Sequence, residues 1–324
     1  MIDRLRFIAL TVFLPGALNV YAYFGFVPYY TKDSFSVATF LAQYESSVFR
    51  YRILGQKLLL AIHDALLSVG YTSNFDVHIL DPVGTGEFYF AYFFLNTSAL
   101  IATALALGCL LRLPCVRATA IERDLLTLVL VFFLVGSQFV VVPYDQLSYF
   151  FLVMGAFALL WSGPYPARLT ILVLSVILGT MTRESTALLL SLCGALLGTS
   201  LAREHRIDRR LLSLLVGYFI ATYVGLRIWL GSSESAVSET VRFHQHFGKS
   251  SLISLIFAAS AYLVLVHGKG DARLRNRFLL FASPYLLAIL LFGQLAEIRL
   301  WMPLLLPFVV LSRLDITWEE RPAS

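Results

Sequence analysis

Long runs of apolar residues alternate with short polar stretches along nearly the whole chain. A helix needs about 20 mostly apolar residues to cross the hydrocarbon core of a bilayer. Several runs are close to that length and contain few charges. The pattern therefore predicts an all-α polytopic membrane protein with about ten transmembrane helices. The predicted spans are residues 7–27, 88–111, 124–143, 146–162, 167–182, 185–202, 211–231, 251–267, 277–294 and 298–312.

The basic residues orient these spans, because short loops rich in Lys and Arg tend to stay in the cytoplasm. With the N-terminus in the cytoplasm, most of the basic residues fall in alternate segments, all on the cytoplasmic side. The connections on the other side carry few of them after the first loop. The sequence thus predicts a multi-pass protein of the cytoplasmic (inner) membrane with both termini inside. The inside residues are Arg4, Arg6, Arg112, Arg117, Arg123, Arg168, Arg203, Arg206, Arg209, Arg210, Lys269, Arg273, Arg275, Arg277, Arg313 and Arg321.

The composition agrees with this interpretation. Of the 324 residues, 58% are hydrophobic and 14% are charged, and the mean hydropathy is +0.77. A soluble domain carries about 25% charged residues. No polar stretch is long enough for a separate soluble domain, so residues 1–324 are predicted to form one transmembrane domain. The net charge of +5 lies in loops that orient the spans, and it does not indicate a nucleic-acid partner.

The first external loop, residues 28–87, is too long to be a plain connection. Within it, residues 34–50 place apolar side chains on one helical stripe, and residues 53–69 carry a narrower polar stripe. Both patterns are typical of amphipathic helices that lie on the outer leaflet. A re-entrant or spanning helix is the alternative for the second segment. The stripe of the first is Val37, Phe40, Leu41, Tyr44 and Val48.

Two acids of this loop are candidates for a general base. Asp33 stands just past the first span, and Glu45 lies on the first amphipathic segment near Arg50 and Arg52. A carboxylate close to the membrane surface is suited to take a proton from a hydroxyl acceptor. Asp33 is equally consistent with a helix N-cap or a first-turn acid.

Charged residues also collect at later external turns. Asp145 stands between the third and fourth spans, Arg183 and Glu184 between the fifth and sixth, and Glu297 and Arg299 between the ninth and tenth. Charges beside membrane spans are costly and usually functional. The alternative is a set of local ion pairs at helix ends, which contribute little to stability.

Four segments resemble, in the right order, bacterial membrane glycosyltransferases of the GT-C fold. "FRYRILGQKLL" (49–59) resembles the family's aromatic-Arg segment, although Gly55 and Gln56 stand where a Pro is frequent. "YDQLSYFFLVMGAFALL" (144–160) resembles a span opened by an acid. "TRESTALLL" (182–190) resembles a basic-Glu-Ser/Thr motif, and "EIRLWMPLLLPFVVL" (297–311) resembles the Arg-then-Pro closing span.

The resemblance implies a transferase whose donor is a sugar linked to a polyprenyl phosphate. The acceptor would be a lipid-linked glycan, a lipid or a protein on the non-cytoplasmic face. Asp33 or Glu45 would be the catalytic base; many members carry adjacent acids where Asp33 stands alone. An arginine fork suits phosphate oxygens. The implied substrate-binding residues are Arg52, Asp145, Arg183, Glu184, Glu297 and Arg299.

Two other functions are consistent with this pattern. A polysaccharide polymerase or ligase of the O-antigen type would use the same lipid-linked substrates, usually with its long loop later in the chain. A secondary transporter would carry repeats and broken helices near the bilayer midplane, and no repeat of halves is evident. A divalent cation is compatible with the acids, but no spacing predicts metal ligands. His244 and His246 lack a third ligand nearby.

Overall fold

Helices make up nearly all of the chain that the computed structural model describes, namely residues 2–25, 35–71, 84–231, 249–292 and 297–318. These ranges contain no strand, only two isolated β-bridges. The fold class predicted from the apolar pattern, all-α, is confirmed. The elements are α1 (Ile2–Ile8), η1 (Ala9–Phe13), α2 (Leu14–Gly25), α3 (Val37–Ser46), η2 (Val48–Tyr51), α4 (Ile53–Ser68), α5 (Gly86–Leu110), α6 (Ala120–Gly136), η4 (Ser137–Phe139), α7 (Asp145–Leu160), α8 (Tyr165–Thr180), η5 (Glu184–Ala187), α9 (Leu188–Leu196), α10 (Ser200–Glu204), α11 (Arg209–Leu230), α12 (Lys249–Leu265), α13 (Ala272–Phe292) and α14 (Ile298–Leu311).

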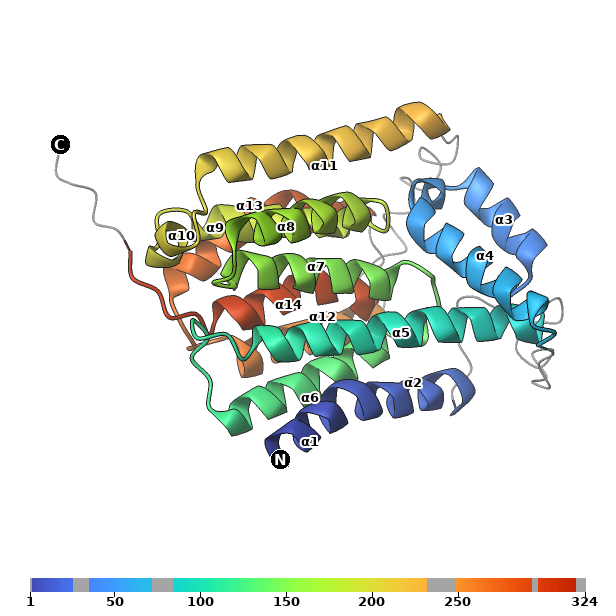
Figure 1. The fold of residues 1–324 in the computed structure, drawn as a ribbon, viewed down its shortest axis with the longest axis horizontal. Helices are drawn as coiled ribbons and strands as arrows, with labels where there is room; N and C mark the ends of the chain where they lie inside the picture. The colour runs from blue at the N-terminus through green and yellow to red at the C-terminus, as the bar shows by residue number, and fades with distance from the viewer. Residues whose placement is uncertain (1, 26–34, 72–83, 232–248, 293–296, 319–324) are drawn as a thin grey trace.

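Most of these helices run side by side along the long axis of the molecule (Figure 1). The helix pairs α5–α7, α7–α8 and α9–α13 pack closely, and α14 packs against α7. The helices α3 and α4 form a separate pair at one end, beside the start of α5, and the short α10 lies at the opposite end (Figure 1). The molecule therefore has two distinct ends, which are called here the α4 end and the α10 end.

Each predicted apolar span contains helix within the residues that the structure describes, although the lengths differ. Four helical stretches are long and apolar enough to cross a membrane, judged by length and composition. Among the other described helices, α7 and α8 have 16 residues each, or about 24 Å of helix. The apolar helices indicate membrane association. The four longer stretches are Asp3–Gly25, Gly86–Leu110, Arg209–Leu230 and Ala272–Leu291.

The span predicted over 124–143 is shorter in the structure, because α6 ends at Gly136. The side chain of Gln146, on α7, donates to the carbonyl of Leu134 at 2.9 Å and to Oγ of Ser137 at 3.1 Å. These bonds hold the end of α6, and the chain continues through the short 3-10 helix η4 and a non-helical segment to α7. The span predicted over 185–202 divides into α9 and α10, with Gly198 (φ 77°) in the turn between them.

The amphipathic segments of the long loop form α3 and α4, as predicted. Their apolar side chains pack on the protein: Phe40, Tyr44 and Leu59 are almost fully buried against Phe88 and Tyr92 of α5. Rings of this cluster meet mostly edge to face, a favourable arrangement, as for Phe40 and Tyr92 at 6.0 Å. The pair α3–α4 is therefore fixed to the α5 start by an aromatic core of its own.

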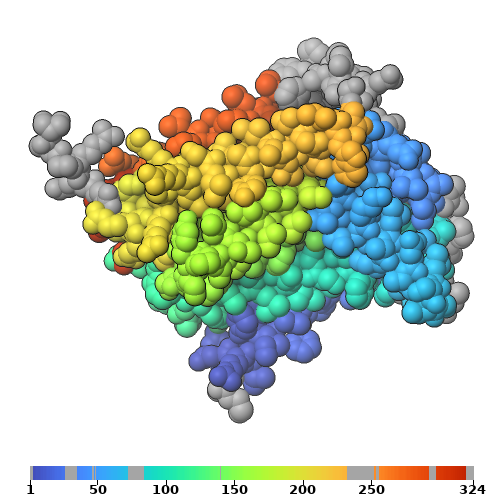
Figure 2. All heavy atoms as spheres, turned by 45° about the horizontal axis from the view of Figure 1, so that its top comes forward, coloured from blue at the N-terminus to red at the C-terminus, as the bar shows by residue number. Residues whose placement is uncertain are grey.

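Large apolar side chains cover much of the outer surface. Figure 2 shows α11 (yellow to orange) lying along the outside of the bundle, over α8. On α11, Ile228 is 78% exposed and Trp229 is 72% exposed. Exposed apolar area of this kind marks an interaction surface and is expected where a helix faces lipid.

Candidate functional site

Asp145 is the centre of a buried charge network at the α4 end. It is the first residue of α7, where the positive end of the helix dipole favours a carboxylate. Its side chain is only 3% exposed. Nη1 of Arg183 donates to Oδ1 of Asp145 at 2.6 Å, and Nη1 of Arg299 lies 3.4 Å from Oδ2. Two guanidinium groups thus compensate one buried carboxylate.

Arg183 is positioned by a break between α8 and η5. Its backbone N–H donates to the carbonyl of Gly179 at 2.8 Å. A side chain at Gly179 would collide with Thr186, whose Cγ2 would lie 2.4 Å from the added Cβ. The glycine therefore lets the chain fold back tightly, which brings Arg183 over the start of α7. Burial disfavours the charged guanidinium, but Asp145 together with Tyr285 and Tyr149 outweighs burial and raises the pKa of Arg183, so the group stays charged.

Arg299 is held at the first turn of α14. Its Nε donates to Oε2 of Glu297 at 2.8 Å. Pro303 has no N–H to bond the carbonyl of Arg299 four residues earlier. The hydroxyl of Tyr149 donates to that carbonyl instead, at 3.0 Å. The proline thus creates an acceptor that ties α14 to α7 beside Asp145.

Arg52 reaches the same region from the loop side. The N–H of Leu54, in the first turn of α4, donates to the carbonyl of Met181 at 3.1 Å. A Cβ on Gly55 would lie 2.6 Å from the carbonyl oxygen of Pro143. The glycine at this place lets α4 approach the turn before α7. Arg52 consequently lies beside the turn that carries Arg183.

Glu184 links Arg52 to a further arginine. Its Oε2 lies 3.3 Å from Nη2 of Arg52, and its Oε1 lies 3.9 Å from Nη2 of Arg227 on α11. Burial disfavours the charged carboxylate, but Arg52 and the neighbouring cations outweigh it and hold the pKa of Glu184 below its ordinary value. The guanidinium of Arg227 also covers the rings of Tyr51 and Tyr223.

Several buried polar groups near this network have no hydrogen-bond partner among the described residues, and two of them lie on the α4 side of it. These two are Nε of Arg52 and the hydroxyl of Tyr44. The guanidinium of Arg52 lies over the ring of Tyr144, 4.4 Å from its centre, and 5.0 Å from that of Phe49. Buried donors normally have a partner, and an unpartnered one often marks a place that a water or ligand fills. Arg52 is therefore held in place by its rings and Glu184, with one N–H left to donate.

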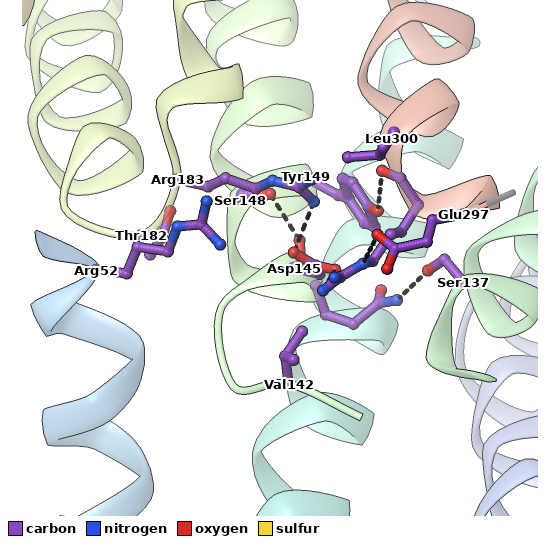
Figure 3. Close-up of polar contacts among 12 residues, drawn as sticks. Arg52, Ser137, Val142, Asp145, Ser148, Tyr149, Thr182, Arg183, Glu297 and Leu300 are labelled. Atoms are coloured by element: carbon purple, nitrogen blue, oxygen red, sulfur yellow. Dashed lines mark hydrogen bonds and ion pairs between the residues drawn. The ribbon is translucent and has the colours of Figure 1, made fainter. Parts of the chain in front are cut away.

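The structure brings together all of the residues predicted to bind substrate, as Figure 3 shows around Asp145. Asp145, Arg183, Glu297 and Arg299 form one chain of ion pairs, and Arg52 and Glu184 form the adjacent pair; these six are called the Asp145 network. Of the two candidate bases, Glu45 lies exposed near the end of α3 and makes no ion pair with the network in the described part of the chain. Asp33 lies outside the described residues, as do His244 and His246.

Several contributors were not predicted. Tyr144, directly before Asp145, and Arg227, within an apolar run, are not among the residues that the sequence predicts for the site. The clue for Tyr144 was its place in "VPYDQ". The sequence did not indicate the pairing of Arg227, because Arg227 lies on α11 and its partner Glu184 lies in η5, far from it in the chain.

No group of three or more His, Cys, Asp or Glu side chains that could hold a metal ion occurs within the described ranges. No protein-family model, curated protein or solved structure matches this chain.

Proposed function

We propose that this protein is a membrane glycosyltransferase that moves a sugar from a polyprenyl-phosphate donor to an acceptor of the cell envelope. In that reaction an acceptor oxygen bonds to the anomeric carbon, and the bond from that carbon to the donor phosphate oxygen breaks. The phosphate leaves with the electron pair, and a carboxylate takes the acceptor proton. The protein must therefore hold a phosphate dianion or monoanion beside apolar surface for the polyprenyl tail.

The observation that carries the proposal is the convergence of Arg52, Arg183 and Arg299 at the α4 end, with Nε of Arg52 buried and unpartnered among the described residues. Guanidinium groups are the preferred ligands of phosphate oxygens. Arg183 and Arg299 already bond Asp145, so we assign them to shaping the site. Arg52, stacked on Tyr144, is assigned to the donor phosphate.

The remaining roles follow from the same proposal. Asp33, or Glu45 in its place, takes the proton of the acceptor hydroxyl. The ten predicted spans cross the inner membrane with both termini inside, which puts the Asp145 network at the outer face. The pair α3–α4 then lies at the level of the outer leaflet, with residues such as Leu67 and Val69, both exposed, toward the lipid.

The test is donor binding and sugar transfer by the purified protein in detergent, with a set of polyprenyl-phosphate sugars. Arg52→Lys keeps the charge but loses the fork, and we expect affinity to fall about tenfold or more, the value of one charge-assisted hydrogen bond. Arg112→Lys is the matched control. Its guanidinium also lies 4.4 Å from a ring centre, that of Phe7, but not at the Asp145 network.

Asp33→Asn in the same assay removes only the charge of the candidate base, and we expect transfer to fall at least 100-fold while the donor still binds. Glu45→Gln is expected to reduce transfer less. If Glu45→Gln alone abolishes transfer, the roles are exchanged. The proposal fails if no donor binds, if Arg52→Lys and Arg112→Lys behave alike, or if reconstituted protein only carries solute across vesicles.

A further inference from the structure

The α10 end contains a cavity of about 290 Å³ between two turns. One turn joins α7 to α8, and the other joins α10 to α11. These two turns lie at the α10 end of the bundle, opposite the α4 end (Figure 1). Its volume is near the lower limit for small-molecule sites. It is lined by Ser162, Gly163, Tyr165, Arg168, Glu204, His205 and Arg206.

Arg168 forms the buried wall of this cavity and is only 5% exposed. Its Nε donates to the carbonyl of Ala158 at 3.0 Å, and its Nη2 donates to the carbonyls of Leu159 and His205 at 3.2 and 2.9 Å. These bonds satisfy carbonyls at the ends of α7 and α10. No carboxylate pairs with Arg168 in the described chain, so its positive charge is not neutralised there.

Arg206 adds a second cation in an unusual backbone conformation. It is the non-glycine residue with a positive φ, 52°, within the described ranges. Such a conformation is strained for a residue with a side chain and is concentrated at functional sites. Its guanidinium lies 5.7 Å from the ring centre of Tyr165. Two guanidinium groups therefore line the cavity against one carboxylate, that of Glu204.

One further feature favours an anion, and a second adds a neutral hydrogen-bonding group. The 16-residue helix α8 begins at Tyr165, so its positive end opens beside the cavity. Burial, together with Arg168, lowers the pKa of His205. Its ring is therefore neutral at neutral pH and able to accept or donate one hydrogen bond without changing the charge balance.

We propose that this cavity binds a phosphate group, either the head group of an anionic phospholipid or a soluble phosphate compound. Basic pockets between membrane helices on the cytoplasmic side are suited to lipid phosphates, and an arginine fork suits phosphate oxygens. Arg206 binds the phosphate from the rim, and Arg168 contributes its charge from the wall. This site is separate from the Asp145 network and does not depend on the proposed transferase activity.

The experiment measures retained lipid by native mass spectrometry of the purified protein, after exchange into phosphatidylglycerol or phosphatidylcholine. A parallel arm titrates delipidated protein with glycerol 3-phosphate and inorganic phosphate while its melting temperature is followed. We expect preferential retention of phosphatidylglycerol if the source is lipid. Stabilisation by glycerol 3-phosphate or inorganic phosphate would indicate a soluble source.

The variant Arg206→Gln removes one lining charge at an exposed position and should weaken binding of whichever probe binds by about tenfold. Arg210→Gln is the matched control, because it removes an exposed charge on the first turn of α11 but does not line the cavity. Arg168→Lys is a second variant for the same binding measurements. A melting temperature near that of the wild type shows that this variant is folded. The proposal is overturned if none of the probes binds, or if Arg210→Gln loses as much binding as Arg206→Gln.

Discussion

The two ends of the bundle use arginine in different ways. At the α4 end the buried guanidinium groups of Arg183 and Arg299 bond a buried carboxylate, that of Asp145. At the α10 end the buried or half-buried Arg168 and Arg277 bond backbone carbonyls where helices end. Ion pairs occur there too: Arg117 and Asp315 are both exposed, and the buried Arg313 pairs with the partly exposed Glu122 at 3.0 Å.

The difference distinguishes arginines that fix helix ends from arginines that are suited to a binding site. A guanidinium on helix-end carbonyls satisfies acceptors that lack a partner and fixes the helix ends. A guanidinium held by a buried carboxylate costs desolvation of both ions, and hydrophobic replacements of such pairs are often as stable. The Asp145 network is thus weak as a stabilising device, which favours a role in binding. Each prediction below sets a change at one end against a matched change elsewhere.

The largest effect is expected from Asp145→Asn. The amide leaves Arg183 and Arg299 buried beside a neutral group, and breaking a buried pair in this way costs about 3–5 kcal/mol. Asp315→Asn, at the α10 end, removes the partner of Arg117 from a site where the side chain of Asp315 is 45% exposed, so its cost should be below about 1 kcal/mol.

The measurement is reversible denaturation of both variants in detergent, or the shift of melting temperature where unfolding is irreversible. Similar losses for Asp145→Asn and Asp315→Asn would mean that water reaches Asp145 freely, and the distinction between the two ends would disappear.

The sequence predicted more of the fold than of the contacts. Apolar periodicity was sufficient for the helical class and for helices within both amphipathic segments of residues 28–87. The positions of charges between apolar runs singled out Asp145, Arg183, Glu184, Glu297 and Arg299, whereas Arg52 was added by the family resemblance. Helix ends were less predictable. The end of α6 depends on Gln146 from the next helix, which bonds Leu134 and Ser137, and no local pattern reports such a contact.

The local sequence also does not predict which charged side chains of the site form ion pairs with one another. Arg183 and Glu184 are neighbours, yet each pairs with a residue from another segment, because the backbone at Arg183 is extended (φ −164°) and adjacent side chains diverge. Arg52 lies beside Glu184 because the start of α4 is held there, where the N–H of Leu54 donates to the carbonyl of Met181. Contacts of this kind are created by the packing of helices distant in the chain.

An intermediate effect is expected from Gly55→Ala. The new Cβ would lie 2.6 Å from the carbonyl oxygen of Pro143, so α4 must shift, at a cost of about 1–3 kcal/mol. The shift moves Arg52 and should weaken donor binding as well as stability. Gly217→Ala, within α11, meets no atom within 4 Å and should be neutral or slightly stabilising.

Melting temperature and donor affinity of both glycine variants check this prediction. A Gly55→Ala protein with wild-type affinity would show that the approach of α4 to Pro143 does not position Arg52.

The smallest effect concerns pH at the α10 end. Burial and Arg168 lower the pKa of His205 in the folded protein from an ordinary value of 6.5, while Glu204 partly opposes this. Below about pH 6.5 the unfolded chain therefore binds a proton that the folded chain does not. The free energy of unfolding is therefore unaffected by His205 titration above about pH 6.5 and decreases as the pH falls below it.

The variant His205→Gln tests this effect. It keeps the backbone carbonyl to which Arg168 donates but removes the titrating ring. From pH 7.5 to pH 5.5 the melting temperature of the wild type should fall more than that of His205→Gln. Equal falls in the two proteins would assign the acid sensitivity to groups other than His205.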